Sequence, residues 1–196
     1  MLQKDLEQNE REKAETDLKC ISKAATTMDT LLSDTLQLSR IGRVANPPED
    51  VSFGAIIQEA LEQTAEQIKS SVAEISVAEN LPTVHVDRMR IAEVLVNLIG
   101  NSIKYMSESA SPKIAIGHYI KGKEAVFFVK DNGIGIDKSQ HEKVFELFYK
   151  LDKNSEGTGA GLAIVKRIIE VHGGHIWIES EKERGAWFIS RCPLCE

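Results

Sequence analysis

Residues 97–162 decide the fold, because they carry three short motifs in a fixed order. The motifs are NLIGNSIKY at residues 97–105, DNGIGI at residues 131–136 and GTGAGL at residues 157–162. The first lies in a stretch with helical periodicity, the second follows an apolar strand-like run, and the third opens an apolar helical run. Each motif is weak alone, but together they predict one ligand site built from distant parts of the chain.

The first motif aligns polar side chains along one stripe of the predicted helix. Asn97, Asn101, Lys104 and Tyr105 occupy positions i, i+4, i+7 and i+8. Amide oxygens suit Mg²⁺, which keeps most of its water or phosphate oxygens, while lysine neutralises phosphate and a tyrosine ring can stack on a base. Because surface helices also carry polar stripes without any ligand, the spacing alone leaves both interpretations open.

The second motif combines a carboxylate with a tight turn. Asp131 ends an apolar run, so its carboxylate can accept a hydrogen bond from an exocyclic amine such as that of adenine. Gly133 and Gly135 allow a sharp turn and a close approach of the backbone to a flat ligand. A plain strand-ending turn explains the same residues, since Asp-Asn-Gly is common turn chemistry.

The third motif places glycines at the start of a helix, where free N–H groups and the helix dipole attract anions. No Gly-Lys-Ser/Thr follows, and Leu162 stands where the dinucleotide-binding fingerprint has its last glycine. The motif therefore predicts phosphate binding without either of the two common phosphate loops.

The composition limits the classes of function. The 196 residues are 42% hydrophobic and 28% charged, with a formal net charge of −6, which is typical of a globular protein and disfavours nucleic acid. No apolar run approaches the ~20 residues of a membrane span. We therefore expect this segment to be cytoplasmic and without membrane contact, whether or not the parent protein is membrane-anchored.

The cysteines are too few and too irregular for a disulfide scaffold, since the chain has three. Cys192 and Cys195 have half of a zinc-site spacing and no second pair. Their role stays open between a metal or redox site and two inert thiols.

The remaining sequence predicts one long helix followed by an α+β domain. Residues 2–41 contain neither glycine nor proline and carry a broad apolar stripe, which suits a helix in a bundle. Gly42, Pro47 and Pro48 end this helix, so we predict a boundary between residues 1–46 and residues 47–196. The second part predicts a two-layer sandwich in which a mixed β-sheet packs on three α-helices. Helices are expected from Ser52 to Ile68 and at residues 88–107 and 160–172, a helical turn at 139–149, and strands at 74–79, 82–86, 113–120, 124–130, 175–180 and 186–191.

The second part resembles the ATP-binding catalytic domain of sensor histidine kinases, within the ATPase family that includes gyrase and heat-shock chaperones. The resemblance rests on the order of an asparagine box, an Asp-x-Gly-x-Gly turn, the Phe145 and Phe148 box and the run GTGAGLAIVK at residues 157–166. It covers residues 51–191 and implies the sandwich fold, with ATP between loops and a mobile lid at residues 150–156.

The resemblance also implies a role for each motif residue. Asn101 matches the Mg²⁺ ligand, Asp131 the adenine acceptor, and Lys104 a phosphate contact with a catalytic role. Asn97 stands where hydrolytic relatives have a glutamate base; since an amide cannot act as a base, this position suits a kinase that spares ATP until a protein acceptor arrives. The other implied ATP contacts are Tyr105, Gly133, Gly135, Ile136, Phe148, Lys150, Gly157, Thr158, Gly159, Ala160, Gly161 and Leu162.

Residues 24–40 resemble the second helix of the dimerisation and phosphoacceptor hairpin of these kinases. The first hairpin helix, with its phosphorylatable histidine, is absent from the sequence; of the five histidines only His141 precedes an acid, in a place unsuited to a phosphoacceptor. The resemblance thus implies a kinase fragment that binds ATP but cannot phosphorylate itself. It also implies a homodimer through this helix in the full-length protein and a response regulator receiver domain as partner. The alternatives are a non-catalytic nucleotide-sensing or dimerisation module and a serine-directed kinase of the same family.

Overall fold

The computed structural model describes residues 2–42, 46–106, 111–121, 124–152, 155, 157–181 and 185–192. The chain divides into two compact units, Met1–Gln37 and Leu38–Glu196. Cys195 and parts of the predicted lid, at residues 153, 154 and 156, lie outside the described residues. The assignment of residues 1–46 to part of a hairpin stays a prediction.

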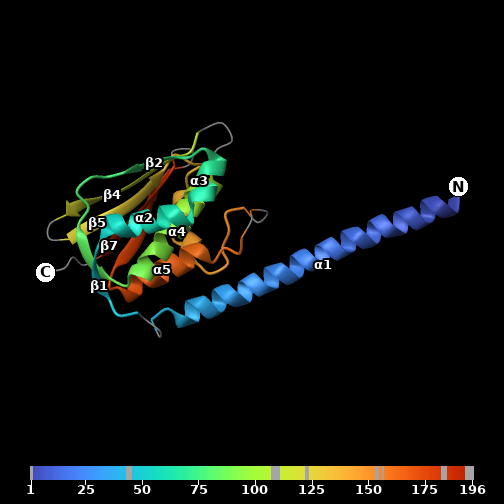
Figure 1. The fold of residues 1–196 in the computed structure, drawn as a ribbon, viewed down its shortest axis with the longest axis horizontal. Coiled ribbons are helices and arrows are strands. Elements are labelled where there is room, and N and C mark those ends of the chain that lie inside the picture. Colours follow the sequence, from blue (N-terminus) through green and yellow to red (C-terminus); the bar gives the residue numbers. More distant parts are fainter. Residues whose placement is uncertain are drawn as a thin grey trace. The chain divides into compact units, whose positions relative to one another are not determined.

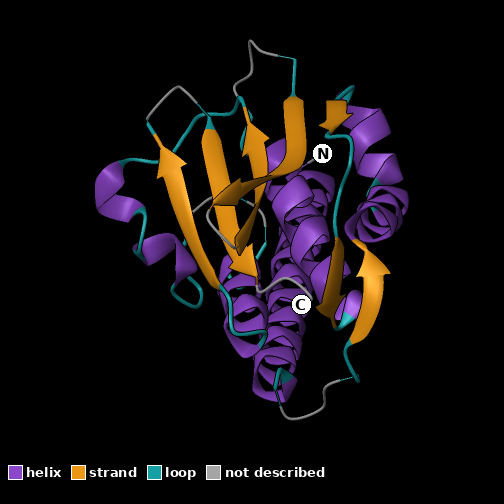
Figure 2. Ribbon diagram, turned by 90° about the vertical axis from the view of Figure 1, so that its left-hand side faces the viewer, coloured by secondary structure: helices purple, strands orange, loops and turns teal. Residues whose placement is uncertain are grey.

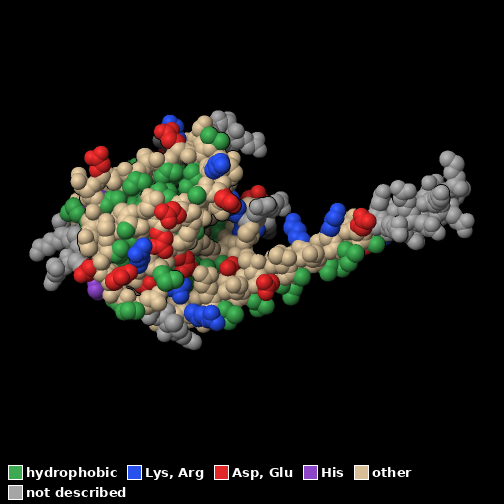
Figure 3. Space-filling model, viewed as in Figure 1, with side chains coloured by type: hydrophobic (Ala, Val, Ile, Leu, Met, Phe, Trp, Pro, Cys, Tyr) green, Lys and Arg blue, Asp and Glu red, His purple; other side chains and the backbone are tan. Residues whose placement is uncertain are grey.

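Residues 2–37 of the first unit lie in α1 (Leu2–Arg40), a single helix of 39 residues. Its apolar stripe is exposed to solvent, and Figure 3 shows hydrophobic side chains along one side of the helix. Between 57% and 65% of the surface is exposed for Leu18, Ile21, Met28, Leu32 and Leu36. A stripe of this width is normally buried against another helix.

The second unit is built on a five-stranded mixed sheet with the strand order β2-β4-β5-β7-β6. The β2 strand is parallel to β4, and the other neighbours are antiparallel. A separate antiparallel pair joins β1 to β3. The strands are β1 (Glu49–Ser52), β2 (Glu74–Val77), β3 (Thr83–Val86), β4 (Lys113–Lys121), β5 (Glu124–Asp131), β6 (His175–Ser180) and β7 (Ala186–Cys192).

Helices cover one face of this sheet, as Figures 1 and 2 show. They are α2 (Phe53–Gln63), α3 (Ala65–Ser71), α4 (Arg88–Lys104) and α5 (Gly161–Val171). The three longer ones, α2, α4 and α5, supply most of the helical side of the core. The architecture confirms the predicted sandwich of a mixed sheet on helices, preceded by one long helix.

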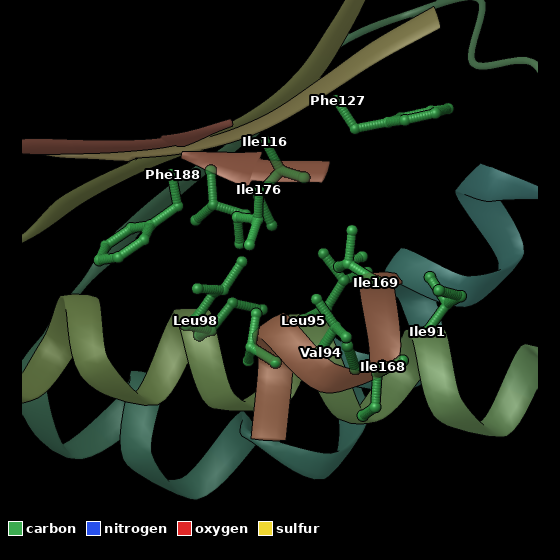
Figure 4. Close-up of a cluster of buried hydrophobic side chains, with 14 of the residues drawn as sticks. Ile91, Val94, Leu95, Leu98, Ile116, Phe127, Ile168, Ile169, Ile176 and Phe188 are labelled. Carbon is green, nitrogen blue, oxygen red and sulfur yellow. The ribbon is translucent and has the colours of Figure 1, made fainter. Parts of the chain in front are cut away.

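Alternation along the strands explains where the core lies. Ala125, Phe127 and Val129 of β5 are buried in the main hydrophobic cluster, on the face toward the helices. Figure 4 shows Leu95 and Leu98 of α4 among these core side chains, which also include Ile176 and Phe188 of the sheet. Because α4 packs its apolar stripe here, its polar stripe is left to face the candidate site.

Three local predictions need correction. The helix expected from Ser52 to Ile68 breaks at Thr64, whose buried hydroxyl donates to the Ala60 carbonyl (2.8 Å). A side chain that bonds the preceding turn in this way bends or ends a helix without any glycine or proline signal. The helical turn expected at residues 139–149 is two short 3-10 helices, η1 (Lys138–Gln140) and η2 (Lys143–Phe145). The strand β1 was not predicted, because four residues before a helix carry no alternation of their own.

The start of α4 is tied to the segment before β1, within the second unit. Asp87, 4% exposed, caps the helix by accepting from Arg90 N (3.2 Å). Its carboxylate also accepts from the backbone and side-chain nitrogens of Asn46, and its own N–H donates to His172 Nε2 (3.2 Å). One residue, through its carboxylate and its backbone N–H, therefore joins the segment before β1, the start of α4 and the end of α5.

Asp87→Ala is expected to destabilise the second unit by about 1–2 kcal/mol, since it removes a helix cap and leaves the partly buried N–H of Arg90 without its partner. Urea unfolding followed by tryptophan fluorescence measures this, because both tryptophans, Trp177 and Trp187, lie in the sheet of this unit. Asp87→Asn keeps an oxygen for the cap and should lose less. Equal stability of the wild type and Asp87→Ala would contradict the role of Asp87.

Candidate functional site

One pocket brings the first and second motifs together with the end of the third. It lies between the C-terminal part of α4, the end of β5 and the start of α5. Of the predicted site residues, its lining contains Asn101, Tyr105, Asp131, Gly135, Ile136, Lys150 and Leu162. Apolar walls with carboxylate, amide and ammonium groups among them are typical of a pocket that takes a flat ring joined to a charged group.

The centre of the site is Asp131, which is only 7% exposed. Its Oδ1 accepts from the backbone N–H groups of Gly133 (2.9 Å) and Ala186 (3.0 Å), and its Oδ2 accepts from the Ser102 hydroxyl (3.2 Å). Burial raises the pKa of the Asp131 carboxyl above its ordinary value of 3.8, and these three hydrogen bonds oppose the shift without cancelling it. A buried carboxylate with a raised pKa at a pocket wall is typical of a functional site.

The raised pKa gives a pH dependence with a definite sign. Because the folded state holds the Asp131 proton more tightly than the unfolded state, this contribution to stability is complete below pH 3.8 and is lost as the pH rises through the folded pKa. We therefore expect wild type to lose stability relative to Asp131→Asn as the pH rises over this window. Urea unfolding of both proteins at several pH values measures the difference, and a constant difference would contradict the raised pKa.

The turn of the second motif docks directly on the end of α4. Ile134 N donates to the Tyr105 carbonyl (3.0 Å), and a Cβ placed on Gly133 would lie 2.5 Å from the same oxygen. Gly135 has a φ of +68°, which a residue with a side chain rarely adopts. The two glycines therefore let the turn lie directly against Asp131 and the carbonyl of Tyr105.

The third motif meets the polar stripe of α4 at the start of α5. A Cβ on Gly161 would lie 2.7 Å from Asn97 Oδ1, and one on Gly157 would lie 3.5 Å from Lys104 Nζ. The other atom of the Asn97 amide, Nδ2, donates to Glu93 O in its own helix (2.9 Å). The helix N-terminus, the amide and the ammonium group therefore lie together, a combination that suits phosphate.

The segment after η2 runs against the same glycines. A Cβ on Gly159 would lie 2.6 Å from the Tyr149 carbonyl, and Gly159 itself has a φ of +83°. Phe148 is half-exposed, with a φ of +65° that is unusual for a bulky residue. The chain at residues 148–150 is thus held in a strained turn beside the third motif.

Not every predicted residue reaches the pocket wall. Those outside its lining are Asn97, Lys104, Gly133, Phe148, Gly157, Thr158, Gly159, Ala160 and Gly161. Asn97 and Lys104 of α4 lie beside the glycines of the third motif, next to the pocket. Within that motif, Thr158 Oγ1 accepts from Ala160 N (3.3 Å). The functional roles of all these residues stay predictions.

Several lining residues were not predicted. They are Ile134, Val144, Tyr149, Leu151, Ala186 and Phe188. Ile134 lies within the second motif, and Val144 and Tyr149 flank the Phe145 and Phe148 box. Their position in the sequence could therefore have suggested that they line the site. Nothing in the sequence around Ala186 and Phe188 indicates the site, because the pairing of β5 with β7 is what brings them to Asp131.

Comparison with known proteins agrees with this geometry. Residues 86–196 match the family model described as histidine kinase-, DNA gyrase B-, and HSP90-like ATPase. The chain belongs to this ATPase family. The matched region holds all three motifs and the pocket, but neither α1 nor α2.

Within this family, the chain is similar to a named histidine kinase. The chain is 54% identical over 192 residues to the methanogenesis regulatory histidine kinase FilI of Methanothrix harundinacea (strain 6Ac), covering 98% of this chain and 22% of FilI. The sequence thus spans about a fifth of this relative. These findings confirm the prediction of a histidine kinase ATP-binding catalytic domain.

Two solved structures, one of them of the histidine kinase ThkA, share the fold. Full-length ShkA in complex with AMPPNP has 26% identity and a TM-score of 0.74, over 92% of this chain and 39% of that one. ThkA in complex with the response regulator protein TrrA has 27% identity and a TM-score of 0.71, over 90% and 50% of the two chains. Within the described part of our chain, no helix is both long and apolar enough to cross a membrane.

Proposed function

We propose that this chain binds ATP with Mg²⁺ and supplies the catalytic region of a two-component sensor histidine kinase. In this proposal the γ-phosphoryl group passes to a histidine on a hairpin helix that the sequence does not contain. The observation that carries the proposal is the meeting of Asn101, Asp131 and Leu162, from three separate motifs, in the lining of one pocket.

The pocket suits adenine at its inner end. The Asp131 carboxylate accepts from the exocyclic amine, while Ile136 and Leu162 offer apolar contact to the ring faces. The ring of Tyr105 lies in the same wall, with Lys104 Nζ 4.8 Å from its centroid. A base placed there points its phosphates toward Lys104 and the N-terminus of α5.

The residues present fit Mg²⁺ held mainly by phosphate and water. The described residues contain no group of three or more histidines, cysteines or acids that could hold a metal alone. Asn101 contributes a single amide oxygen at the pocket wall, which is the kind of ligand that Mg²⁺ takes when it stays largely hydrated. The ion would supply neutralisation of the phosphate charge.

The polar stripe of α4 favours transfer to a protein over hydrolysis. Asn97 lies at the start of α5 but cannot accept a proton as a general base, and its Nδ2 is already held by Glu93 O. Water in this position stays a weak nucleophile, whereas a neutral imidazole attacks without prior activation. In the transfer, the bond between the γ-phosphorus and its bridging oxygen breaks, a nitrogen–phosphorus bond forms, and ADP leaves.

Two partners follow from the proposal. The exposed apolar stripe of α1 supports a homodimer of the full-length protein through this helix, with the phosphoacceptor helix completing the bundle. The complex of ThkA with TrrA supports a response regulator receiver domain as the later acceptor of the phosphoryl group. We further propose that the fragment is incompetent for autophosphorylation, because it lacks the acceptor histidine.

The experiment mixes this chain with a separately produced phosphoacceptor hairpin from a related kinase and ATP labelled on the γ-phosphate. We expect label on the hairpin that is lost in acid and kept in base, as for phosphohistidine. The chain incubated alone should stay unlabelled. ATP binding by calorimetry without any transfer would favour the nucleotide-sensing module, and acid-stable label on serine would favour the serine-directed kinase.

A further inference from the structure

The hydroxyl of Ser102 makes a contact that sets it apart from the other helical hydroxyl groups. Thr26, Thr64 and Ser71 each donate to a carbonyl four residues earlier in their own helix. Ser102, which is 2% exposed, donates instead across the interface between α4 and the sheet, to Asp131 Oδ2 (3.2 Å). A buried serine that leaves its own helix for a carboxylate on another element holds that carboxylate in place.

The hydrogen bonds of Asp131 show what this contact controls. A carboxylate offers roughly four acceptor positions, two on each oxygen. Both positions on Oδ1 are filled, by the backbone N–H groups of Gly133 and Ala186. Ser102 fills one position on Oδ2, so the described part of the chain leaves one acceptor position of this carboxylate, which lines the pocket.

We propose that Ser102 is a positioning residue that fixes base specificity, by orienting Asp131 Oδ2 so that its remaining acceptor position meets one N–H of a 6-amino group on a purine. The inference rests on the proposed function, because it assumes that Asp131 binds the base. A 6-oxo group at the same place would present an acceptor to an acceptor, so the arrangement selects 6-aminopurine nucleotides against 6-oxopurine nucleotides.

The Ser102 hydroxyl matters because the backbone N–H groups bind only Oδ1 of the Asp131 carboxylate. Without Ser102, Oδ1 stays anchored by its two N–H donors, while Oδ2 has two unfilled acceptor positions and can turn either toward the base. The cost should therefore appear only with ligands that carry the amine. A purely structural role for Ser102 would weaken all nucleotides alike.

The test uses calorimetry on the full 196-residue chain with two ligands in the presence of Mg²⁺. One ligand is ATP, and the other is the triphosphate of purine riboside, which lacks the 6-amino group. For Ser102→Ala we expect ATP to bind about tenfold more weakly and the purine analogue to bind within about twofold of wild type. Retained binding of the analogue also shows that the variant is folded.

The matched control is Ser71→Ala, which removes a hydroxyl bonded only within its own helix and should leave both affinities unchanged. No loss for ATP with Ser102→Ala, or an equal loss for both ligands, would overturn the positioning role. Asp131→Asn separates this failure from failure of the proposed function. If Asp131→Asn weakens ATP and Ser102→Ala does not, only the inference about Ser102 is wrong; if neither does, the base is not bound at Asp131.

Discussion

Asp131→Asn is expected to lower the affinity for ATP by about 100-fold or more. The carboxylate lies in the pocket wall and makes a charge-assisted hydrogen bond to the base in our proposal. Losing such a bond costs about 1.5–3 kcal/mol, which is about 10- to 150-fold in affinity. In the asparagine variant an N–H group also faces the amine, so a donor meets a donor and the loss reaches the upper end of this range or beyond.

The fold should survive this substitution. The oxygen of asparagine can keep accepting from Gly133 N and Ala186 N, and its nitrogen can donate to the Ser102 oxygen, which has free lone pairs. Calorimetry with Mg²⁺ and ATP measures the affinity, and urea unfolding at neutral pH checks stability. Asp137→Asn, at an exposed carboxylate that accepts from Ser139 N, is the matched control and should bind like wild type. An unchanged ATP affinity in Asp131→Asn would remove Asp131 from the site.

Much of the fold and site could be predicted because the deciding signals are local. Asp87 caps α4 through the amide three residues later, and this needs no knowledge of the tertiary structure. The helix that carries Asn101 and Tyr105 places both on one side by periodicity alone, and the structure has both in the pocket lining. The apolar run before Asp131 likewise predicts a buried strand, and the structure has Phe127 and Val129 in the core.

The remaining features depend on contacts between residues far apart in the sequence. Ala186 reaches Asp131 only because β7 pairs with β5, and strand order is not encoded by the pattern of either strand. The hydroxyl of Ser102 could have bonded within its own helix, and only the packing of α4 on β5 offers it Asp131. His172 reads as the end of a helix in the sequence, yet its ring accepts from the N–H of Asp87.

The pocket depends on two helices that are joined at the ends away from it. The Asp87 end of α4 meets the His172 end of α5 through the hydrogen bond between them. At their opposite ends, α4 presents Asn101 and Tyr105, and α5 presents Leu162, to the pocket. Side chains on helices anchored in this way lose little further freedom when a ligand binds, which supports tight recognition.

Asn101→Ala is expected to weaken Mg²⁺-ATP at least about tenfold, a loss typical of removing even an indirect partner of a metal ion. Nucleotide in the presence of a chelator should bind within about twofold of wild type, because the base contacts at Asp131 remain. The difference arises because the proposed Asn101 contact goes to the ion and not to the nucleotide. Calorimetric titrations with ATP, with and without Mg²⁺, measure both affinities on the same protein.

A remote amide provides the control for this prediction. Gln58→Ala removes an exposed amide of α2 that bonds only Glu62, and it should leave the response to Mg²⁺ unchanged. An equal loss with and without the ion in Asn101→Ala would mean that the amide binds the nucleotide itself, so the metal role would be wrong. A loss confined to Mg²⁺-ATP would instead place the ion between Asn101 and the phosphates, beside Lys104 and the start of α5, where the phosphoryl group has to leave ATP.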